Sequence, residues 1–449
     1  MTKSDDRKLE ELALEATRTG MSRVTFMKRA LAMGASVAAI ASALDAIEGP
    51  TGARAAGAPQ VSINFSSWGS LAEQVTVNQL LEIFQKRYPN ITVQPRYTDF
   101  GDYFTKLNAD VATKSIADVL FLTYVPTYAA KGALQDIRPA LKSQGRSLAG
   151  YTPGQLFLFE YAGGVYGVPR DTDTKVIFYN RKLFKQAGVA YPKDGWSYDD
   201  LRTTAKALTK GSGARISQYG YAYETDLWRL WLWQNGVELF DNNAKPTKAT
   251  FNTPAGAQAL QFIADLTNVD QVTPPPTQMA SSATISSLFA SGQLAMAFGN
   301  HALVPTFTTV KGLDWFVVGM PHFTGQKTVN ASGGAGYAIS KWTQQPHAAY
   351  ELWNFFTGVF AIETFSAGND VTPITPQVLS SSAWLSKPYN KIFAQQTQYG
   401  HLLPSFASFF NILNTVGSDL DKVWIGEQKA ADALAIGEKD ANKALKAGA

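Results

Sequence analysis

The sequence contains no cysteine among its 449 residues and only four histidines. The missing cysteine excludes disulfide bonds, thiolate zinc sites, iron–sulfur clusters and cysteine nucleophiles together. No histidine pair has the H-E-x-x-H spacing that places two metal ligands on one helix face. The G-x-S-x-G motif of many serine hydrolases and the phosphate-binding G-x-x-x-x-G-K-[ST] loop are missing too. We therefore expect no metal, no cofactor and no catalytic residue.

An excess of charge of one sign is also missing. The 40 lysines and arginines are scattered along the chain and face 36 acidic residues, which leaves a net charge of +4. A balance so close to zero argues against nucleic acid as a partner. Hydrophobic residues make up 45% of the chain, which is enough to fold. The length exceeds what one ordinary core requires and suggests two domains.

Residues 1–55 have the composition of an export signal. A polar segment ends in Lys28 and Arg29, and the uncharged stretch Ala30–Leu44 follows it. That stretch is shorter than the ~20 residues that a membrane-spanning helix needs. The sequence Ala53–Ala55 then matches an A-x-A cleavage site, so we expect a signal peptide of 55 residues.

The export route is left open by one residue. Ser22–Lys28 reads S-R-V-T-F-M-K and resembles the twin-arginine signal S-R-R-x-F-L-K, with Val24 in place of the second arginine. Because no cysteine follows the apolar run, no lipid attachment site exists there. We expect a soluble protein without a lipid anchor in the periplasm.

The residues after position 60 alternate between strand and helix patterns. Residues 61–65 alternate apolar and polar side chains, residues 77–84 carry apolar side chains at helical spacing, and 91–93 and 118–122 indicate two more strands. This alternation predicts an α/β fold with a mostly parallel sheet flanked by helices. Ligands of such sheets collect at the loops beyond the carboxyl ends of the strands.

Later segments give more local predictions. Residues 164–169 are typical of a tight hairpin, and residues 175–180 of a strand. Ser197 with Asp200 predicts a capping box at a helix start. Apolar residues between 420 and 434 predict one C-terminal helix.

Five segments, in this order, carry a resemblance to a known family: Gly164–Phe184, Trp196–Leu201, Phe289–Asn300, Ser332–Ile339 and Gly426–Leu434. They resemble the extracellular solute-binding proteins (family 1, maltose-binding-protein-like) of ATP-driven carbohydrate importers. The resemblance implies the type II periplasmic-binding-protein fold, in which two α/β lobes enclose a ligand cleft. It places residues 60–170 plus 334–373 in an N-terminal lobe and 171–333 plus 374–449 in a C-terminal lobe.

The same resemblance implies a function without catalysis. The protein would be the substrate-binding component of an ABC sugar importer, a monomer that captures a sugar and delivers it to transmembrane permease subunits. A sugar offers hydroxyl groups and flat C–H patches, so its site needs polar groups, carboxylates above all, and aromatic faces.

Nine residues are candidates for such a site. Trp68 and Tyr124 follow predicted strands, and Asp171 and Asp173 lie at the predicted crossing between lobes. By resemblance, Tyr124, Asp173 and Glu224 match binding positions of the family. The alternatives are core packing for the aromatic residues, a solvated turn or surface position for the carboxylates, and ordinary turns for the glycines. The full set is Trp68, Tyr124, Asp171, Asp173, Glu224, Trp231, Asn300, Gly333 and Gly334.

One segment departs from the family pattern. Where the family often has Gly-x-Trp, this chain has Gly299-Asn300-His301-Ala302. The stacking face of that tryptophan would then come from His301 or from one of Phe406, Phe409 and Phe410.

Two other functions remain open. Asp171 and Asp173 could act as the acid and base of a secreted glycoside hydrolase, although alternate residues in an extended turn point apart. A non-sugar solute such as a polyol or a glycerol-phosphate compound is the other. Few lysines or arginines lie in the predicted cleft loops besides Arg170. This scarcity of positive charge favours a neutral sugar over a phosphorylated one.

Overall fold

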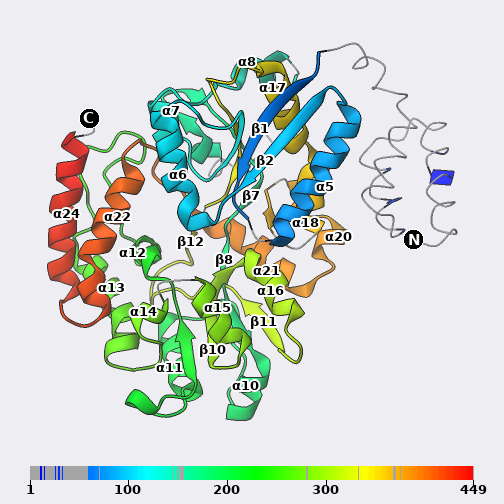
Figure 1. The fold of residues 1–449 in the computed structure, drawn as a ribbon. Helices are drawn as coiled ribbons and strands as arrows, with labels where there is room; N and C mark the ends of the chain where they lie inside the picture. Colours follow the sequence, from blue (N-terminus) through cyan, green and yellow to red (C-terminus); the bar gives the residue numbers. More distant parts are fainter. Residues whose placement is uncertain are drawn as a thin grey trace.

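The structure, a computed structural model, describes residues 59–447 except 70, 144, 149–150, 152–155, 280–281, 332, 368–370 and 375, together with seven single residues before position 59. The export signal expected over residues 1–55 therefore lies outside the described residues, apart from those single positions. Figure 1 shows the described chain as two α/β lobes, one above the other.

The N-terminal lobe is built on a five-stranded sheet in the order β2-β1-β3-β13-β6. Strand β1 runs parallel to both β2 and β3, and β13 is antiparallel to β3 and β6. The alternation predicted over 61–65 is confirmed as β1. The strands are β1 (Val61–Ser67), β2 (Ile91–Tyr97), β3 (Val119–Leu122), β6 (Val168–Pro169) and β13 (Gly336–Ile339).

Helices on both faces bury the sheet of this lobe. The predicted helix over 77–84 is confirmed as part of α5, whose Leu80 and Phe84 are fully buried. Ridges of apolar residues at helical spacing stabilise it against the sheet. The helices of this lobe are α5 (Leu71–Arg87), α6 (Phe100–Ala112), α7 (Pro126–Ala130), α8 (Arg138–Ser143), α17 (Pro346–Phe356) and α18 (Val359–Ala367).

The C-terminal lobe has a four-stranded sheet in the order β11-β8-β10-β9. Strand β10 is antiparallel to β8 and parallel to β9, and β11 is antiparallel to β8. The predicted strand 175–180 is confirmed as β8, whose six residues are all buried. The strands are β8 (Lys175–Asn180), β9 (Tyr219–Ala222), β10 (Leu294–Asn300) and β11 (Trp315–Val318).

Helices flank this second sheet. The capping box is confirmed, because Ser197 and Asp200 exchange both capping hydrogen bonds at the start of α11. The helices are α10 (Arg181–Ala187), α11 (Tyr198–Leu208), α12 (Trp228–Gln234), α13 (Pro254–Asn268), α14 (Pro276–Met279), α15 (Ser282–Ala290), α16 (Val304–Thr309), α19 (Pro376–Leu379), α20 (Ser382–Leu385), α21 (Pro388–Gln396), α22 (Phe409–Asp419), α23 (Asp421–Trp424) and α24 (Ala430–Ala447).

Two local predictions are wrong. Residues 164–169 do not pair with each other: β5 (Gly164–Val165) pairs with β4 (Glu160–Tyr161), and β6 joins the large sheet beside β13. The single helix expected over 420–434 is interrupted, because these residues fall in α23 and the start of α24, with Leu420 between α22 and α23. Apolar spacing continues across the breaks because all three helices bury residues in one core.

Short strands outside the two large sheets pair with each other, and the pair formed by β7 and β14 lies where the chain crosses between the lobes. Strand β7 (Asp171–Thr172) pairs antiparallel with β14 (Thr372–Pro373), and Asp173 bridges to Gly333. Strand β12 (Asn330–Ala331) pairs with β15 (Gly400–His401). Figure 1 shows β7, β8 and β12 at the waist between the lobes. Along the described part of the chain, no helix combines the length and apolar character needed to cross a membrane.

Candidate ligand-binding site at the lobe junction

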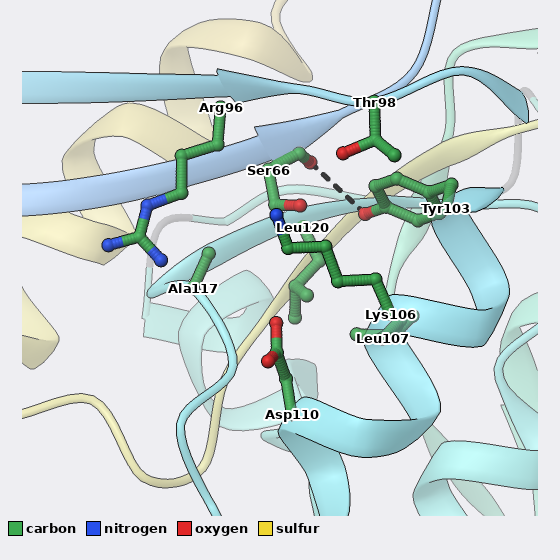
Figure 2. Close-up of a pocket in the computed structure, with 9 residues that line it drawn as sticks. All are labelled: Ser66, Arg96, Thr98, Tyr103, Lys106, Leu107, Asp110, Ala117 and Leu120. Atoms are coloured by element: carbon green, nitrogen blue, oxygen red, sulfur yellow. Dashed lines mark hydrogen bonds between the residues drawn. The ribbon is translucent and has the colours of Figure 1, made fainter.

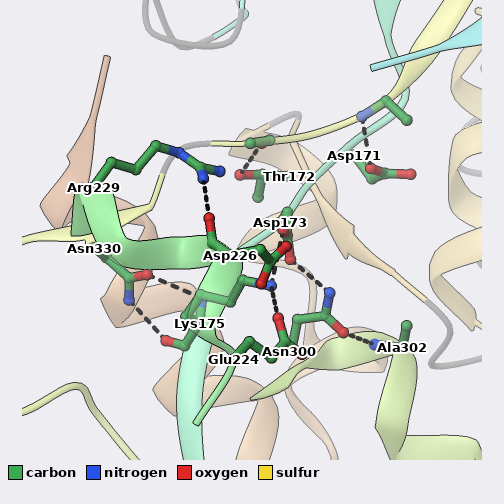
Figure 3. Close-up of polar contacts among 12 residues, drawn as sticks. Asp171, Thr172, Asp173, Lys175, Glu224, Asp226, Arg229, Asn300, Ala302 and Asn330 are labelled. Carbon is green, nitrogen blue, oxygen red and sulfur yellow. Dashed lines mark hydrogen bonds and ion pairs between the residues drawn. The ribbon is translucent and has the colours of Figure 1, made fainter. Parts of the chain in front are cut away.

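A buried lysine organises the polar groups at the lobe junction (Figure 3). The ammonium group of Lys175, at the start of β8, lies 3.1 Å from Asp173 Oδ2 and 3.9 Å from Glu224 Oε2. Asn300 Nδ2, at the end of β10, donates to Asp173 Oδ1 at 2.6 Å. Three predicted site residues, Asp173, Glu224 and Asn300, are thereby brought together around one cation.

The backbone of Lys175 is fixed as firmly as its side chain. The buried amide of Asn330 accepts from Lys175 N at 3.0 Å and donates to Lys175 O at 2.7 Å. A second acceptor, Gln396 Oε1, lies 3.0 Å from Asn330 Nδ2. Because buried polar networks are stable only when fully bonded, this arrangement holds the start of β8 in one position.

The charges of this cluster shift the protonation of its members. Burial lowers the pKa of Lys175, but the nearby Asp173 and Glu224 outweigh burial and raise it, so the ammonium stays charged. Burial raises the pKa of Glu224, and the more distant Lys175 only partly opposes this effect. Of the two carboxylates, Asp173 has the more exposed side chain, at 34% against 14%.

Asp171 has different partners, all on the N-terminal side of the crossing. Its Oδ2 accepts from Arg170 Nε at 2.6 Å, and its Oδ1 accepts from Ala335 N at 3.1 Å. Burial raises the pKa of Asp171, and the adjacent Arg170 opposes that shift. The carboxylate is therefore engaged in holding two crossing segments together.

Arg170 connects this crossing to the loop that follows β1. Its guanidinium lies between the rings of Phe121 and Phe365, 4.2 and 4.3 Å from their centroids, and contacts Glu73 Oε1 at 3.3 Å. Glu73 belongs to the first turn of α5, directly after the loop that carries Trp68. The loop with Trp68 thus reaches the lobe junction.

The glycine pair lies against the crossing strand. A side chain at Gly334 would place its Cβ 2.3 Å from the backbone oxygen of Asp171, and at Gly333 3.1 Å from the Cβ of Asp173. The close approach at the glycine pair is therefore to the backbone segment 171–173. Ser332, between these residues and β12, lies outside the described residues.

Trp68 is half-buried in a group of aromatic side chains. Its ring packs edge-on against Phe100 and Tyr103, and tilted against Phe104 and Phe121, with centroids 4.5–5.5 Å apart. One part of the indole is held in the core while the rest stays accessible. A partly exposed, well-held indole is suited to stack on a sugar face.

The hydroxyl of Tyr124 is fully used within the protein. It accepts from Phe406 N at 2.8 Å and lies 2.9 and 2.7 Å from the carbonyl oxygens of Pro404 and Phe406, to one of which it donates. Thr127 Oγ1 donates to Ala407 O at 3.0 Å in the same region. Tyr124 is 3% exposed. This residue fastens the segment 404–407 to the N-terminal lobe.

Trp231 lies in the core of the C-terminal lobe and not on an accessible surface. Its side chain is fully buried, and its ring packs against Tyr223 and Trp424 at 5.3 and 5.8 Å. Helix α12 buries residues on all sides, so helical spacing did not identify an outward face. Core packing is the placement that the structure gives to this residue.

The aromatic candidates near Asn300 also differ in exposure. His301 is 2% exposed and its Nε2 lies 2.9 Å from Asn390 Oδ1. Burial lowers its pKa to about 4, so the ring is neutral. Phe406 and Phe409 are buried, whereas Phe410 is half-buried and packs edge-on against Tyr124 at 4.8 Å. Phe410 alone among the four keeps substantial accessible surface.

Sequence reasoning missed three residues of the cluster. Lys175 stands at the start of an apolar strand, Asn330 precedes the glycine pair, and Arg229 follows Trp228 on α12. Arg229 donates to Asp226 O at 3.0 Å, and Figure 3 shows it beside the carboxylates. The one signal in the sequence was the position of Lys175 at the start of the predicted strand 175–180. A lysine buried in a strand requires a partner, so this position indicated carboxylates nearby.

A separate small pocket lies inside the N-terminal lobe, away from the junction (Figure 2). It opens between α6 and the strands, and Tyr103 donates there to Ser66 O at 3.2 Å. Its charged lining residues are Arg96, Lys106 and Asp110. Since only one lobe lines it, this pocket does not have the geometry of an interlobe site. No group of metal-ligating side chains was found among the described residues.

Comparisons with known proteins agree with this architecture. The arabinooligosaccharide-binding protein of Bacillus subtilis (strain 168) is 24% identical over 226 residues, 48% of this chain and 50% of the relative. The sn-glycerol-3-phosphate-binding periplasmic protein of Brucella abortus (strain 2308) is 24% identical over 284 residues, 59% of this chain and 63% of the relative. The matched part of the chain thus covers about half of the length of some curated relatives and less than two thirds of the length of others.

Solved structures share the fold. An ABC substrate-binding protein of Listeria monocytogenes in complex with cycloalternan has a TM-score of 0.78 and 24% identity, over 86% of this chain and 99% of that one. At this identity the likeness establishes the two-lobe fold. A family model for bacterial extracellular solute-binding proteins matches residues 59–359, more than half of the chain. This chain belongs to the family of bacterial extracellular solute-binding proteins.

Proposed function

We propose that this protein captures a neutral sugar between its lobes and delivers it to the permease subunits of an ABC importer. The observation that carries the proposal is the group Asp173, Glu224 and Asn300 at the junction of two lobes in a chain of this family. Carboxylate and amide groups fixed at such a junction are suited to bind sugar hydroxyls.

The lobes are proposed to consist of residues 60–170 plus 334–373 and 171–333 plus 374–449. This division follows the two large sheets and puts the exchanges between lobes at β7, at β14 and near Gly334. The proposed ligand contacts are Trp68 from one lobe and Asp173, Glu224 and Asn300 from the other. Closure of the lobes on a ligand would be a population shift toward the form that binds better.

Location and assembly belong to the same proposal. We propose that residues 1–55 direct export, that the mature chain is a periplasmic monomer without a lipid anchor, and that it binds without catalysis. A matched family of solute-binding proteins supports binding over hydrolysis. Asp171 is also bound to Arg170 and to Ala335 N, which speaks against its use as the acid or base of the hydrolase alternative.

The ion pairs at the site bear on whether the ligand is neutral or negatively charged. Arg170 contacts Asp171 and Glu73, and Lys175 contacts Asp173 and Glu224, so these two cations have carboxylate partners. The third cation, Arg229, lies in the field of Asp226, Asp173 and Glu224, which oppose the lowering of its pKa by burial. A phosphorylated ligand would have to compete with these carboxylates for them. The structure therefore favours a neutral sugar over a glycerol-phosphate compound.

Isothermal titration calorimetry of the chain without residues 1–55 tests the proposal. The panel consists of neutral mono- and oligosaccharides, polyols and sn-glycerol 3-phosphate. We expect saturable binding of at least one neutral sugar, with a smaller radius of gyration in small-angle scattering. Binding of glycerol 3-phosphate alone, or turnover of any sugar in the panel, would overturn the proposal.

A further inference from the structure

Arg229 is the one residue of α12 that is not buried. The other six residues of this seven-residue helix, Trp228 and Trp231 among them, are buried in the C-terminal lobe. Arg229 is half-buried, so its side chain leaves the core on the one side of the helix that stays accessible. Figure 3 shows that this side faces the carboxylates at the lobe junction.

The position of Arg229 follows from the end of a strand. Strand β9 ends at residue 222, and the segment after it carries Glu224 and then Arg229. Asn300 ends β10, the parallel neighbour of β9. The carboxyl ends of two parallel strands meet at one edge of the sheet, which is where ligands of α/β sheets bind. Arg229 therefore lies at the same edge as two residues of the proposed site.

Most donors of the Arg229 guanidinium have no partner. In the part of the chain that the structure describes, one hydrogen bond uses them, from Nη1 to Asp226 O at 3.0 Å. The Nε atom is buried and has no hydrogen-bond partner among the same residues. Asp173 and Glu224 form their ion pairs with Lys175. Because a buried N–H group without an acceptor is unfavourable, the Nε side of the guanidinium is suited to bind an oxygen of a ligand.

The shape of this side limits what can bind there. Nε and Nη2 form one edge of the guanidinium with two parallel N–H groups, and the bond to Asp226 O occupies Nη1 instead. Such an edge fits two neighbouring oxygen atoms at once, because guanidinium donors have a fixed fork geometry. A carboxylate group offers two such oxygens, and so do two adjacent hydroxyl groups of a sugar.

The surrounding charges favour the hydroxyl groups. Burial lowers the pKa of Arg229, and Asp226, Asp173 and Glu224 oppose that shift, so all three acidic groups act on this guanidinium. With Lys175, the cluster has two cations and three acidic side chains. A ligand carboxylate would add a further negative charge to an excess of acidic groups, which is unfavourable. Neutral hydroxyl groups can bind to the same edge without this repulsion.

We propose that Arg229 is a specificity-determining residue of the junction site, donating from Nε and Nη2 to two adjacent hydroxyl groups of the sugar. This inference rests on the proposed function, because the ligand is the neutral sugar proposed there. It narrows the substrate class to sugars in which both of these hydroxyl groups are free. A sugar that lacks either of them binds more weakly.

The test combines protein variants with ligand variants in isothermal titration calorimetry. The ligands are the tightest-binding neutral sugar of the panel and its monodeoxy derivatives, one for each hydroxyl group. For the unaltered chain, removal of either of two adjacent hydroxyl groups should weaken binding by about tenfold or more through the lost bond to Arg229. Arg229→Lys keeps the positive charge but has no edge of two parallel N–H groups, so it should weaken binding of the full sugar by a similar factor.

The two kinds of variant are then compared in a double-mutant cycle. With Arg229→Lys, the losses at the two adjacent hydroxyl positions should shrink to about threefold or less, and losses at the other positions should stay as they are. A merely structural role of Arg229 would instead weaken all derivatives by the same factor. Arg215→Met is the matched control, because Arg215 is an exposed arginine of the same lobe, and it should bind every derivative like the unaltered chain.

The outcomes separate this inference from the proposed function. If a neutral sugar binds but Arg229→Lys leaves every affinity unchanged, or lowers all of them equally, the role of Arg229 is refuted while the proposed function stands. If D-glucuronate or D-galacturonate binds more tightly than every neutral sugar and Arg229→Lys removes that binding, the acceptor is a carboxylate and the inference is overturned. If no sugar binds the unaltered chain, the proposed function fails and the inference fails with it.

Discussion

Replacement of Lys175 by methionine tests the central cluster most directly. Methionine keeps nearly the same length but removes the charge that lies 3.1 Å from Asp173 and 3.9 Å from Glu224. Breaking a buried ion pair by removing one partner costs about 3–5 kcal/mol, because the other charge stays buried. The Asp173 side chain is 34% exposed and therefore partly stabilised by water, which places the expected loss near the lower end, at about 3 kcal/mol.

The loss should depend on pH in a defined direction. Burial already raises the pKa of Glu224 with Lys175 present, and without that cation the pKa should rise further. A carboxyl group whose folded pKa is above its unfolded pKa favours folding at low pH, and this effect disappears as pH rises through the folded value. The deficit of Lys175→Met should therefore be large near pH 7.5 and smaller near pH 5.

Urea unfolding followed by tryptophan fluorescence at both pH values measures this deficit. Lys182→Met is the matched control, since Lys182 is an exposed lysine on α10 and its loss should change the free energy of unfolding by less than about 0.5 kcal/mol. An unfolding free energy equal to that of the control, or a deficit of the same size at both pH values, would refute the reasoning.

Three further predictions concern single side chains. Tyr124→Phe leaves the buried Phe406 N–H and a carbonyl without their partner, so the free energy of unfolding should fall by about 2 kcal/mol; affinity for a bound sugar should stay within about twofold, and a large affinity loss at unchanged stability would contradict this assignment. His301 has a pKa of about 4 because burial disfavours its charged form. Its contribution to the free energy of unfolding should be complete above the unfolded pKa near 6.5 and fall by up to about 3 kcal/mol as pH drops toward 4. In chemical denaturation, His301→Gln should show a shallower dependence on acid, and an equal dependence would rule out His301 as its source. Trp68→Leu should weaken sugar binding by at least about tenfold through the loss of a stacking face, as calorimetry can measure; unchanged affinity in a folded variant would exclude Trp68 from the site.

Much of the N-terminal lobe could be predicted from the sequence because its signals are local. The alternation at 61–65 and the apolar spacing at 77–84 depend on periods of two and 3.6 residues, and both elements form as expected. In the C-terminal lobe, the capping box of Ser197 and Asp200 likewise needs only four consecutive residues. Such features depend on neighbouring residues and need no contact with a distant part of the chain.

The remaining features depend on partners far away in sequence. The hydroxyl of Tyr124 bonds to residues about 280 positions later, and no local pattern shows that it is engaged. Residues 164–169 were expected to form a hairpin, but β6 instead pairs with Gly336–Tyr337. Trp231 lies on a helix that is buried on all sides, so the spacing of apolar residues along that helix could not identify an accessible face. Lys175 was overlooked because only one of its carboxylate partners, Asp173, is near it in sequence, whereas Glu224 comes from the segment after β9.

The position of β13 in the N-terminal sheet has a consequence for synthesis and folding. This strand, residues 336–339, lies between β3 and β6, although β3 ends at residue 122. While the ribosome is still making residues 123–335, the three parallel strands β2-β1-β3 have an uncovered edge at β3 whose four residues are all apolar. Unpaired apolar edges promote aggregation. The β3 edge therefore stays open to pairing with other strands until about three quarters of the chain has been made.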